Sequence, residues 1–140
     1  MATTATISIA SDIWSSFSGI NKTMTLTQAG TTTDIDSTTG FSRRKLSATS
    51  SVDLITMANE LVEPDDNTAA KIYIKNIGGT RSLDKTAYVT VTINAQEIGR
   101  LYGDDWLMMP LTVVDGEDVV VTPSTDDTVI LEYAMFYEEA

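Results

Sequence analysis

The sequence contains no histidine and no cysteine among its 140 residues. Without cysteine the chain has no disulfide, no thiolate nucleophile and no Cys/His zinc site. Without histidine, no catalytic scheme uses imidazole as its base. Basic residues are also few, with nine Lys and Arg against 20 Asp and Glu and a formal net charge of -11. Since phosphate binding needs many Lys and Arg on one face, nucleic acid is not an expected partner. We expect no enzyme, no cofactor and no metal site.

Long hydrophobic runs are missing as well, because charges, Thr and Ser interrupt every apolar stretch. A transmembrane helix needs roughly 18 consecutive apolar residues, and so no membrane partner is predicted. Residues 1–10 have neither a basic start nor a long apolar stretch, and we therefore expect no secretory signal. The length fits one ordinary domain. These features favour a protein made in a cytoplasm.

The acidic charge is concentrated towards the C-terminus. Residues 1–60 carry five acids and four bases, whereas residues 101–140 carry ten acids and no base. The first half is rich in Thr and Ser, and the second half holds most of the large apolar residues. We therefore interpret residues 1–66 as Thr/Ser-rich N-terminal strands and loops that serve for packing or docking. Residues 67–140 are interpreted as an acidic β-sandwich core.

Apolar residues in the second half alternate with polar ones, a period that indicates half-buried strands. Val89, Val91 and Ile93 alternate with Thr and Asn within residues 86–94, and Pro110 marks the edge or the end of another strand. Turns with Gly, Pro, Asn and Asp separate six predicted strands, at residues 72–75, 86–94, 98–102, 106–111, 119–122 and 128–137. The pattern predicts an all-β fold, an antiparallel β-sandwich or jelly roll with a Thr-rich N-terminal extension.

The first half gives weaker strand signals, at residues 3–9, 23–28 and 46–56. Residues 52–62 fit either a strand that runs into a loop or a short helix, because their apolar residues also share one helical stripe. The Thr and Asp content of residues 30–40 predicts a mobile surface loop.

The last predicted strand is apolar on both faces. One face carries Leu131 and the residues that alternate with it, all of which are apolar. The other face is also apolar, at Ile130, Ala134 and Phe136. Such a strand either lies at the centre of a packed sheet or is covered by a neighbouring subunit. The second alternative predicts a homo-oligomer with Phe136 and Tyr137 near the contact.

Charged residues offer three further candidate sites. Arg43, Arg44 and Lys45 form the chain's one basic cluster, which is either an exposed turn or an anchor onto an acidic partner surface. Glu132 lies on a predicted strand, but two Trp provide little aromatic lining for a glycosidase cleft. Acids in predicted turns are either solvated or calcium ligands: Asp104, Asp105, Asp115, Glu117, Asp118, Asp126 and Asp127.

The order of motifs in residues 71–138 carries a family resemblance. I-x-I-x-N at 72–76 is followed by V-x-V-x-I at 89–93, G-R-L-Y-G-D-D at 99–105, an apolar strand that reaches Pro110, and V-x-L-E-Y at 129–133. This half of the chain resembles the small β-sandwich virion structural proteins of tailed bacteriophages. Each motif alone is typical of any small sandwich, and the order and spacing carry the resemblance.

The resemblance implies a virion structural protein, a capsid decoration or cement protein that binds neighbouring virion subunits in multiple copies. A tail, neck or fibre accessory protein is the alternative. A host-surface or glycan-binding module is another, for which Tyr102 and Trp106 are the nearby aromatic pair. Under the first hypothesis the N-terminal segment docks on a neighbouring subunit through an apolar set, which comprises Ile7, Ile9, Trp14 and Phe17. Trp14 and Phe17 equally suit packing on their own sandwich.

Overall fold

The computed structural model describes residues 3–10, 19–25, 35, 37–57, 68–78, 87–114, 116–125 and 129–137. Within these ranges every regular element is a β-strand, and no helix is present. The strands are β1 (Thr4–Ile9), β2 (Ile20–Thr25), β3 (Ser37–Thr38), β4 (Ser42–Leu46), β5 (Val52–Ile55), β6 (Thr68–Asn76), β7 (Tyr88–Ile93), β8 (Gln96–Tyr102), β9 (Trp106–Val113), β10 (Val119–Pro123) and β11 (Val129–Tyr137).

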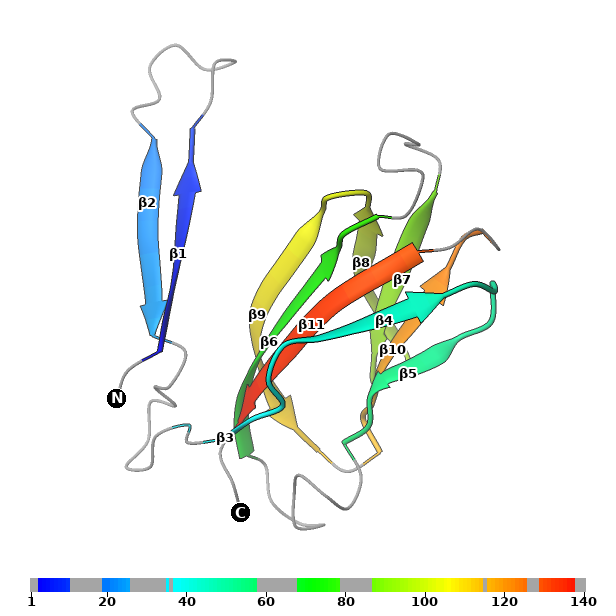
Figure 1. Cartoon of the computed structure of the whole chain (residues 1–140). Coiled ribbons are helices and arrows are strands. Elements are labelled where there is room, and N and C mark those ends of the chain that lie inside the picture. The colour runs from blue at the N-terminus through cyan, green and yellow to red at the C-terminus, as the bar shows by residue number, and fades with distance from the viewer. Residues whose placement is uncertain are drawn as a thin grey trace.

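Two antiparallel sheets form a sandwich, as the sequence predicts (Figure 1). The first sheet has the strand order β3-β11-β6-β9, with β4 also paired to β11, and we call it the β6 sheet. The second has the order β5-β10-β7-β8, and we call it the β7 sheet. β1 and β2 pair with each other as a separate antiparallel hairpin, which Figure 1 draws beside the sandwich.

The main core lies between the two sheets and follows from strand alternation. Ile72, Ile74 and Leu131 of the β6 sheet are fully buried, as are Val89 and Val91 of the β7 sheet. Val119, Val121 and Met135 complete the fully buried strand residues of this cluster. Since burying one such side chain contributes about 1.5–3 kcal/mol, this core dominates the stability of the sandwich.

The strand predictions for residues 67–140 are confirmed. All six predicted strands correspond to β6 through β11. Asn94 and Ala95 connect β7 to β8 with φ angles of 48° and 56°, as expected for a tight turn in a right-twisted hairpin. Pro110 lies in β9, the edge strand of the β6 sheet, where a missing N–H leaves no bond unmade within the sheet.

Two predictions for the first half are wrong. Residues 46–56 are not one strand, because β4 ends at Leu46 and belongs to the β6 sheet, whereas β5 belongs to the β7 sheet. The small residues 47–51 let the chain cross between the sheets. Within 30–40, β3 pairs with β11, and Ile35 is only 2% exposed, so the described residues of this segment, 35 and 37–40, are not simply a surface loop. Of residues 52–62, the described part forms strand β5 with no helix.

The sandwich takes strands from both sides of the interpreted boundary between residues 1–66 and 67–140. β4 pairs with β11 over five residues, and β5 pairs with β10. Only the β1–β2 hairpin stands outside both sandwich sheets among the described strands. The separable part of the N-terminal region is therefore this hairpin.

β11 is a central strand. It pairs with β6 along one edge and with β3 and β4 along the other. This arrangement fits the first of the two alternatives, an ordinary strand at the centre of a packed sheet. Ala134 is fully buried and Phe136 is 9% exposed on the face that points away from the main core. That second face is therefore also covered, within a single copy of the chain.

Candidate interaction surface

The β1–β2 hairpin has one apolar and one polar face. The register places Ile7 opposite Lys22 and Ile9 opposite Ile20, so these four side chains share a face with the Ala5–Met24 pair. The opposite face consists of Thr, Ser and Asn residues, in pairs such as Thr6 and Thr23, whose hydroxyl oxygens are 2.9 Å apart. We call β1 and β2 together the hairpin arm. Its apolar face is the kind of surface that a strand pair normally buries.

The base of the hairpin arm is attached to the sandwich. Ala5 and Met24 pack against a small cluster formed by Ile35, Ala134 and Phe136. The Lys71 ammonium donates a hydrogen bond to the carbonyl oxygen of Thr25. Burial of this ammonium lowers the pKa of Lys71 below its ordinary value. These contacts attach one end of the arm to the β6 sheet.

The far end of the hairpin arm leaves its apolar face uncovered. Ile9 is 49% exposed and Ile20 is 41% exposed, although they form a directly opposed apolar pair. A two-stranded hairpin without a covered apolar face is only marginally stable in water. The arm therefore has apolar surface available to a partner.

The outer face of the β6 sheet, which points away from the main core, carries a second uncovered apolar group. Phe41 is 70% exposed and meets Tyr73 edge to face, with ring centroids 5.8 Å apart. Trp106 of β9 is 46% exposed, and its neighbour on this face is Met108, which pairs with Tyr73. We call Phe41, Tyr73 and Trp106 the aromatic surface. Exposed Trp and Tyr side chains are typical of binding hot spots.

Basic residues surround the aromatic surface. The register puts Arg43, Lys45, Lys71 and Lys75 on this outer face, with Glu132 as its one acid among the described strand residues. Arg43, Glu132, Lys75 and Trp106 form one row across four strands, because each is opposite the next. In a chain with a net charge of -11, this face is the exception.

Glu132 organises the centre of the row. It accepts hydrogen bonds from the Arg43 guanidinium at 3.0 Å and from the Tyr73 hydroxyl at 3.3 Å. The pKa of Tyr73 is raised above its ordinary value, first because burial disfavours the phenolate, and then because the Glu132 carboxylate repels it and accepts its hydrogen bond. The Arg43 side chain is 67% exposed, so its ion pair contributes little to stability.

The raised pKa of Tyr73 gives a test of this geometry. We expect Glu132→Gln to lower this pKa towards its ordinary value without reaching it, because burial, the larger cause, remains. The pKa is raised in the folded state, so its contribution to stability is complete below about pH 10 and is lost as the pH rises through the folded pKa. Tyrosinate absorbance during alkaline titration measures it, with Tyr73→Phe to assign the signal. An unchanged Tyr73 pKa in Glu132→Gln would contradict the contact.

The structure divides the predicted basic cluster. Arg43 and Lys45 point to the outer face, whereas Arg44 points the other way and donates a hydrogen bond to the Asp53 carbonyl at 2.7 Å. Strand alternation is the reason, since neighbouring side chains on a strand point to opposite faces. Arg43 is already engaged by Glu132. Only Arg43 and Lys45 therefore lie on one face, where a single partner surface would contact both.

The other predicted contact residues that the structure describes do not form one surface. Ile7 and Ile9 lie on the apolar face of the hairpin arm, while Trp14 and Phe17 lie outside the described residues. Phe136 is covered by the base of the arm, and Tyr137 packs against the main core. Within one copy these last two residues are already in contact with their own chain. Their predicted role in a contact between subunits stays a prediction.

Sequence reasoning missed the aromatic surface and its basic surroundings. Lys71, Tyr73 and Lys75 alternate with the buried Ile72 and Ile74, and this alternation was the available signal. The proximity of Phe41 and Glu132 to Tyr73 depends on strand pairing and cannot be seen in the sequence. Tyr102, suggested as a partner of Trp106, instead contacts Tyr88 on the outer face of the β7 sheet, with ring centroids 5.4 Å apart.

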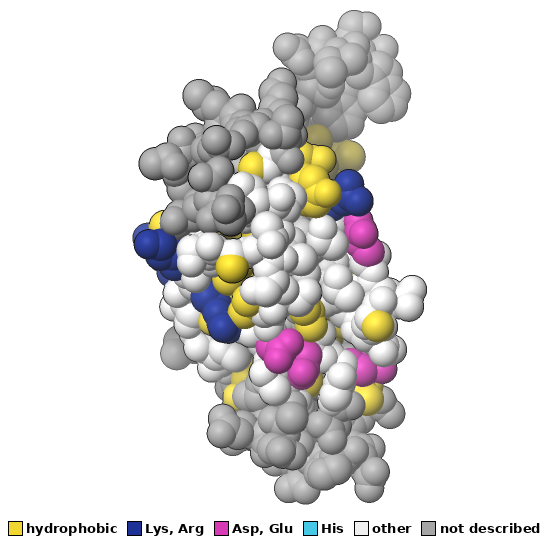
Figure 2. Space-filling model, turned by 90° about the vertical axis from the view of Figure 1, so that its right-hand side faces the viewer, with side chains coloured by type: hydrophobic (Ala, Val, Ile, Leu, Met, Phe, Trp, Pro, Cys, Tyr) yellow, Lys and Arg dark blue, Asp and Glu magenta, His cyan; other side chains and the backbone are white. Residues whose placement is uncertain are grey.

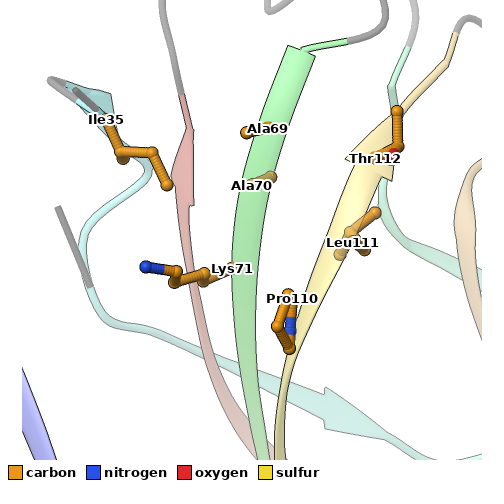
Figure 3. Close-up of a pocket in the computed structure, with 7 residues that line it drawn as sticks. All are labelled: Ile35, Ala69, Ala70, Lys71, Pro110, Leu111 and Thr112. Atoms are coloured by element: carbon orange, nitrogen blue, oxygen red, sulfur yellow. The ribbon is translucent and has the colours of Figure 1, made fainter. Parts of the chain in front are cut away.

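A hollow of about 290 Å³ lies beside the base of the hairpin arm (Figure 3). It is lined by Ile35, by Ala69, Ala70 and Lys71 of β6, and by Pro110, Leu111 and Thr112 of β9. Figure 3 shows Lys71 reaching from β6 towards the side on which Ile35 lies. The Lys71 amine already donates a hydrogen bond to the Thr25 carbonyl. No acidic side chain is among the residues that line the hollow, so these residues include no acid-base pair for catalysis.

Several acids in the turns hold the backbone in place. Asp105 accepts a hydrogen bond from the Tyr102 amide at 3.0 Å, and Asp118 accepts one from the Met57 amide at 2.7 Å. Glu117 accepts one from the Asn94 side chain at 2.7 Å. Within the described part of the chain, no three acidic side chains are close enough to hold a metal ion. Asp115, Asp126 and Asp127 lie outside it.

The side of the molecule opposite the hairpin arm has a different character (Figure 2). Its hydrophobic side chains occur in small separate groups among polar atoms, and basic and acidic side chains are both present on it. On the β7 sheet, the Arg100 guanidinium lies 4.6 Å from the Tyr88 ring centroid and 3.1 Å from Glu97. These groups pair within the chain.

Comparisons with known proteins give a distant structural likeness. No family model matches the chain, and no curated protein shows significant similarity to it. A solved structure, the crystal structure of a cupin protein from Bacteroides fragilis, is similar at 17% sequence identity with a TM-score of 0.34. The alignment covers 71% of this chain and 64% of the cupin protein. In the described ranges we find no helix of the length and hydropathy that a membrane span requires.

Proposed function

We propose that the chain is a structural protein of a tailed-bacteriophage virion, a capsid decoration or cement protein that binds neighbouring virion subunits in multiple copies. The observation that carries the docking role is the hairpin arm, which is attached at its base and exposes the Ile9–Ile20 pair at its far end. The assignment to a phage virion rests on the resemblance of residues 71–138, whose motifs occupy strands β6 to β11 in order.

The proposed function requires no catalysis and no cofactor. The sandwich is a rigid support, since its strands are joined by ladders and its core is made mainly of Val, Ile and Leu. The excess of negative charge keeps separate copies soluble before assembly. Binding energy then comes from apolar and aromatic side chains that remain exposed on the folded chain.

A glycan-binding role on a host surface is the second candidate. The observation that favours it is Trp106, which is 46% exposed on the outer face of the β6 sheet, opposite Lys75. Binding of the isolated protein to a glycan array, with loss of binding in Trp106→Ala, would support this role. A tail, neck or fibre position would share the docking chemistry and differ in where the protein lies in the particle.

Incorporation into particles tests the proposed function. In the phage that encodes the chain, we expect Ile9→Asp together with Ile20→Asp to reduce binding to particles assembled without the protein by at least tenfold, because burying the exposed half of two isoleucine side chains contributes about 1.5–3 kcal/mol. Ile98→Asp is the matched control, since Ile98 is 44% exposed but lies on β8, away from the arm. Co-sedimentation measures the bound fraction. Equal binding of the double variant and the wild type would refute docking through the arm.

A further inference from the structure

Four of the five most exposed large hydrophobic residues among those described lie on two surfaces of this chain. Ile9 and Ile20 belong to the hairpin arm, whereas Phe41 and Trp106 belong to the aromatic surface. Ile98 on β8 is the fifth. Single exposed apolar side chains are ordinary, but two matched groups in one chain indicate surfaces that become buried on assembly.

We propose that the aromatic surface of one copy receives the hairpin arm of a second copy. This inference rests on the proposed function and names the partner of the arm. Its first support is continuity with a contact that already exists. The base of each arm packs on the outer face of its own β6 sheet, where Ala5 and Met24 cover Ala134 and Phe136. The same apolar face of the arm continues to Ile9 and Ile20.

The same outer face of the sheet also continues beyond that contact. Tyr73 is opposite both Ala134 and Met108, so the aromatic surface directly adjoins the cluster that the arm base covers. The chain's own arm stands beside its sandwich and leaves Phe41 and Trp106 exposed (Figure 1). Ile9 and Ile20 of an arm from another copy would cover the exposed side chains of the aromatic surface.

Charge complementarity also favours a second copy as the partner. The outer face carries Arg43, Lys45 and Lys75 around the aromatic surface, with Glu132 as its acid. Two copies with a net charge of -11 each repel one another overall, but acidic side chains of the second copy that lie next to this basic face are attracted to it. The described residues of the arm carry a single charge, on Lys22. The arm therefore provides the apolar contact, and the basic face lowers the repulsion between the two acidic bodies where they meet.

An arm and a receiving surface on every chain make a head-to-tail contact, in which two different surfaces meet. Such a contact repeats from copy to copy and closes into a ring or extends into a chain. It suits a protein present in multiple copies. Because the arm and the aromatic surface are made of different residues, each can be removed by mutation without changing the other.

Two variants and their mixture test the proposal by sedimentation velocity. The arm variant combines Ile9→Ser with Ile20→Ser, the surface variant combines Phe41→Ser with Trp106→Ser, and Ile98→Ser is the control. We expect the wild type and the control to self-associate and each of the other variants to do so at least tenfold more weakly. An equimolar mixture of the two variants retains one intact contact and is expected to form pairs and nothing larger.

Three outcomes would overturn the inference: a wild type that stays monomeric at about 100 µM, self-association that survives both variants, or a mixture that fails to form pairs. If the surface variant does not fold, Phe41→Ser alone replaces it, because Phe41 lies outside the strands and is 70% exposed. A monomeric wild type whose Ile9/Ile20 variant still loses particle binding would overturn this inference and leave the proposed function standing.

Discussion

Leu131→Ala is expected to lower the free energy of unfolding by about 3–5 kcal/mol. Leu131 is fully buried in the main core, in the middle of a strand that is paired along both edges. Its removal leaves a cavity between two sheets whose ladders prevent them from closing over the space. Urea denaturation followed by circular dichroism measures the loss.

The adjacent residue provides the control for this experiment. Ile130 lies on the opposite face of β11 and is only half-buried, so we expect Ile130→Ala to cost roughly 1 kcal/mol or less. Equal losses in the two variants would contradict the placement of the core on one face of β11. An unchanged slope of free energy against urea would show that both variants unfold from the same compact state.

Asn76→Leu is expected to cost about 2–5 kcal/mol, because it leaves two buried polar groups without partners. The Asn76 side chain is 3% exposed, donates a hydrogen bond to the Leu101 carbonyl at 3.1 Å and accepts one from the Gly78 amide at 2.9 Å. Leu101 belongs to the β7 sheet, so this side chain joins the two layers. The leucine matches its volume but makes neither bond.

An exposed hydrogen bond between side chains is the matched control. The Ser51 and Thr122 hydroxyl oxygens are 2.8 Å apart at the surface, where water replaces either partner. We expect Ser51→Ala to change the free energy of unfolding by less than about 0.5 kcal/mol. A loss in Asn76→Leu no larger than in Ser51→Ala would show that Asn76 does not join the layers. Thermal unfolding of both variants provides the comparison.

The strands of residues 67–140 could be predicted because burial imposes a period of two on them. Val89 and Val91 face the main core while the intervening Thr90 faces outward, and the sequence shows this alternation directly. Gly, Asn and Asp then mark the turns by their tolerance of positive φ, as at Asn94. Local chemistry was sufficient for these elements.

The strands of the first half were harder to predict because they have fewer apolar residues to mark a buried face. Leu46 and Leu54 are both buried in the main core, yet they reach it from different sheets. A single predicted strand over residues 46–56 satisfied their spacing equally well. Ile35 is buried by contacts with Ala134 and Phe136, which are about a hundred residues away in the chain. Such contacts leave no local signal.

The candidate surface was predictable in part. Ile7 and Ile9 were recognised as apolar docking residues, but their face became clear only when the register paired Ile9 with Ile20. The basic cluster looked uniform in the sequence and was divided by strand alternation. The contact of Tyr73 with Glu132 joins strands 59 residues apart, and it depends entirely on the pairing of β6 with β11.

Taken together, the residues describe a rigid sandwich with an arm whose apolar face is only partly covered. The base of the arm is held by Met24 and by the bond from Lys71 to Thr25, and the far end presents Ile9 and Ile20. We expect this far end to be buried when the protein assembles into a particle.

A high-resolution electron cryo-microscopy map of the intact particle would show whether the arm is buried. We expect density for many copies of the sandwich on the virion, each with Ile9 and Ile20 buried against a neighbouring subunit. A map that places the sandwich in the particle but leaves the arm facing solvent along its whole length would contradict this expectation.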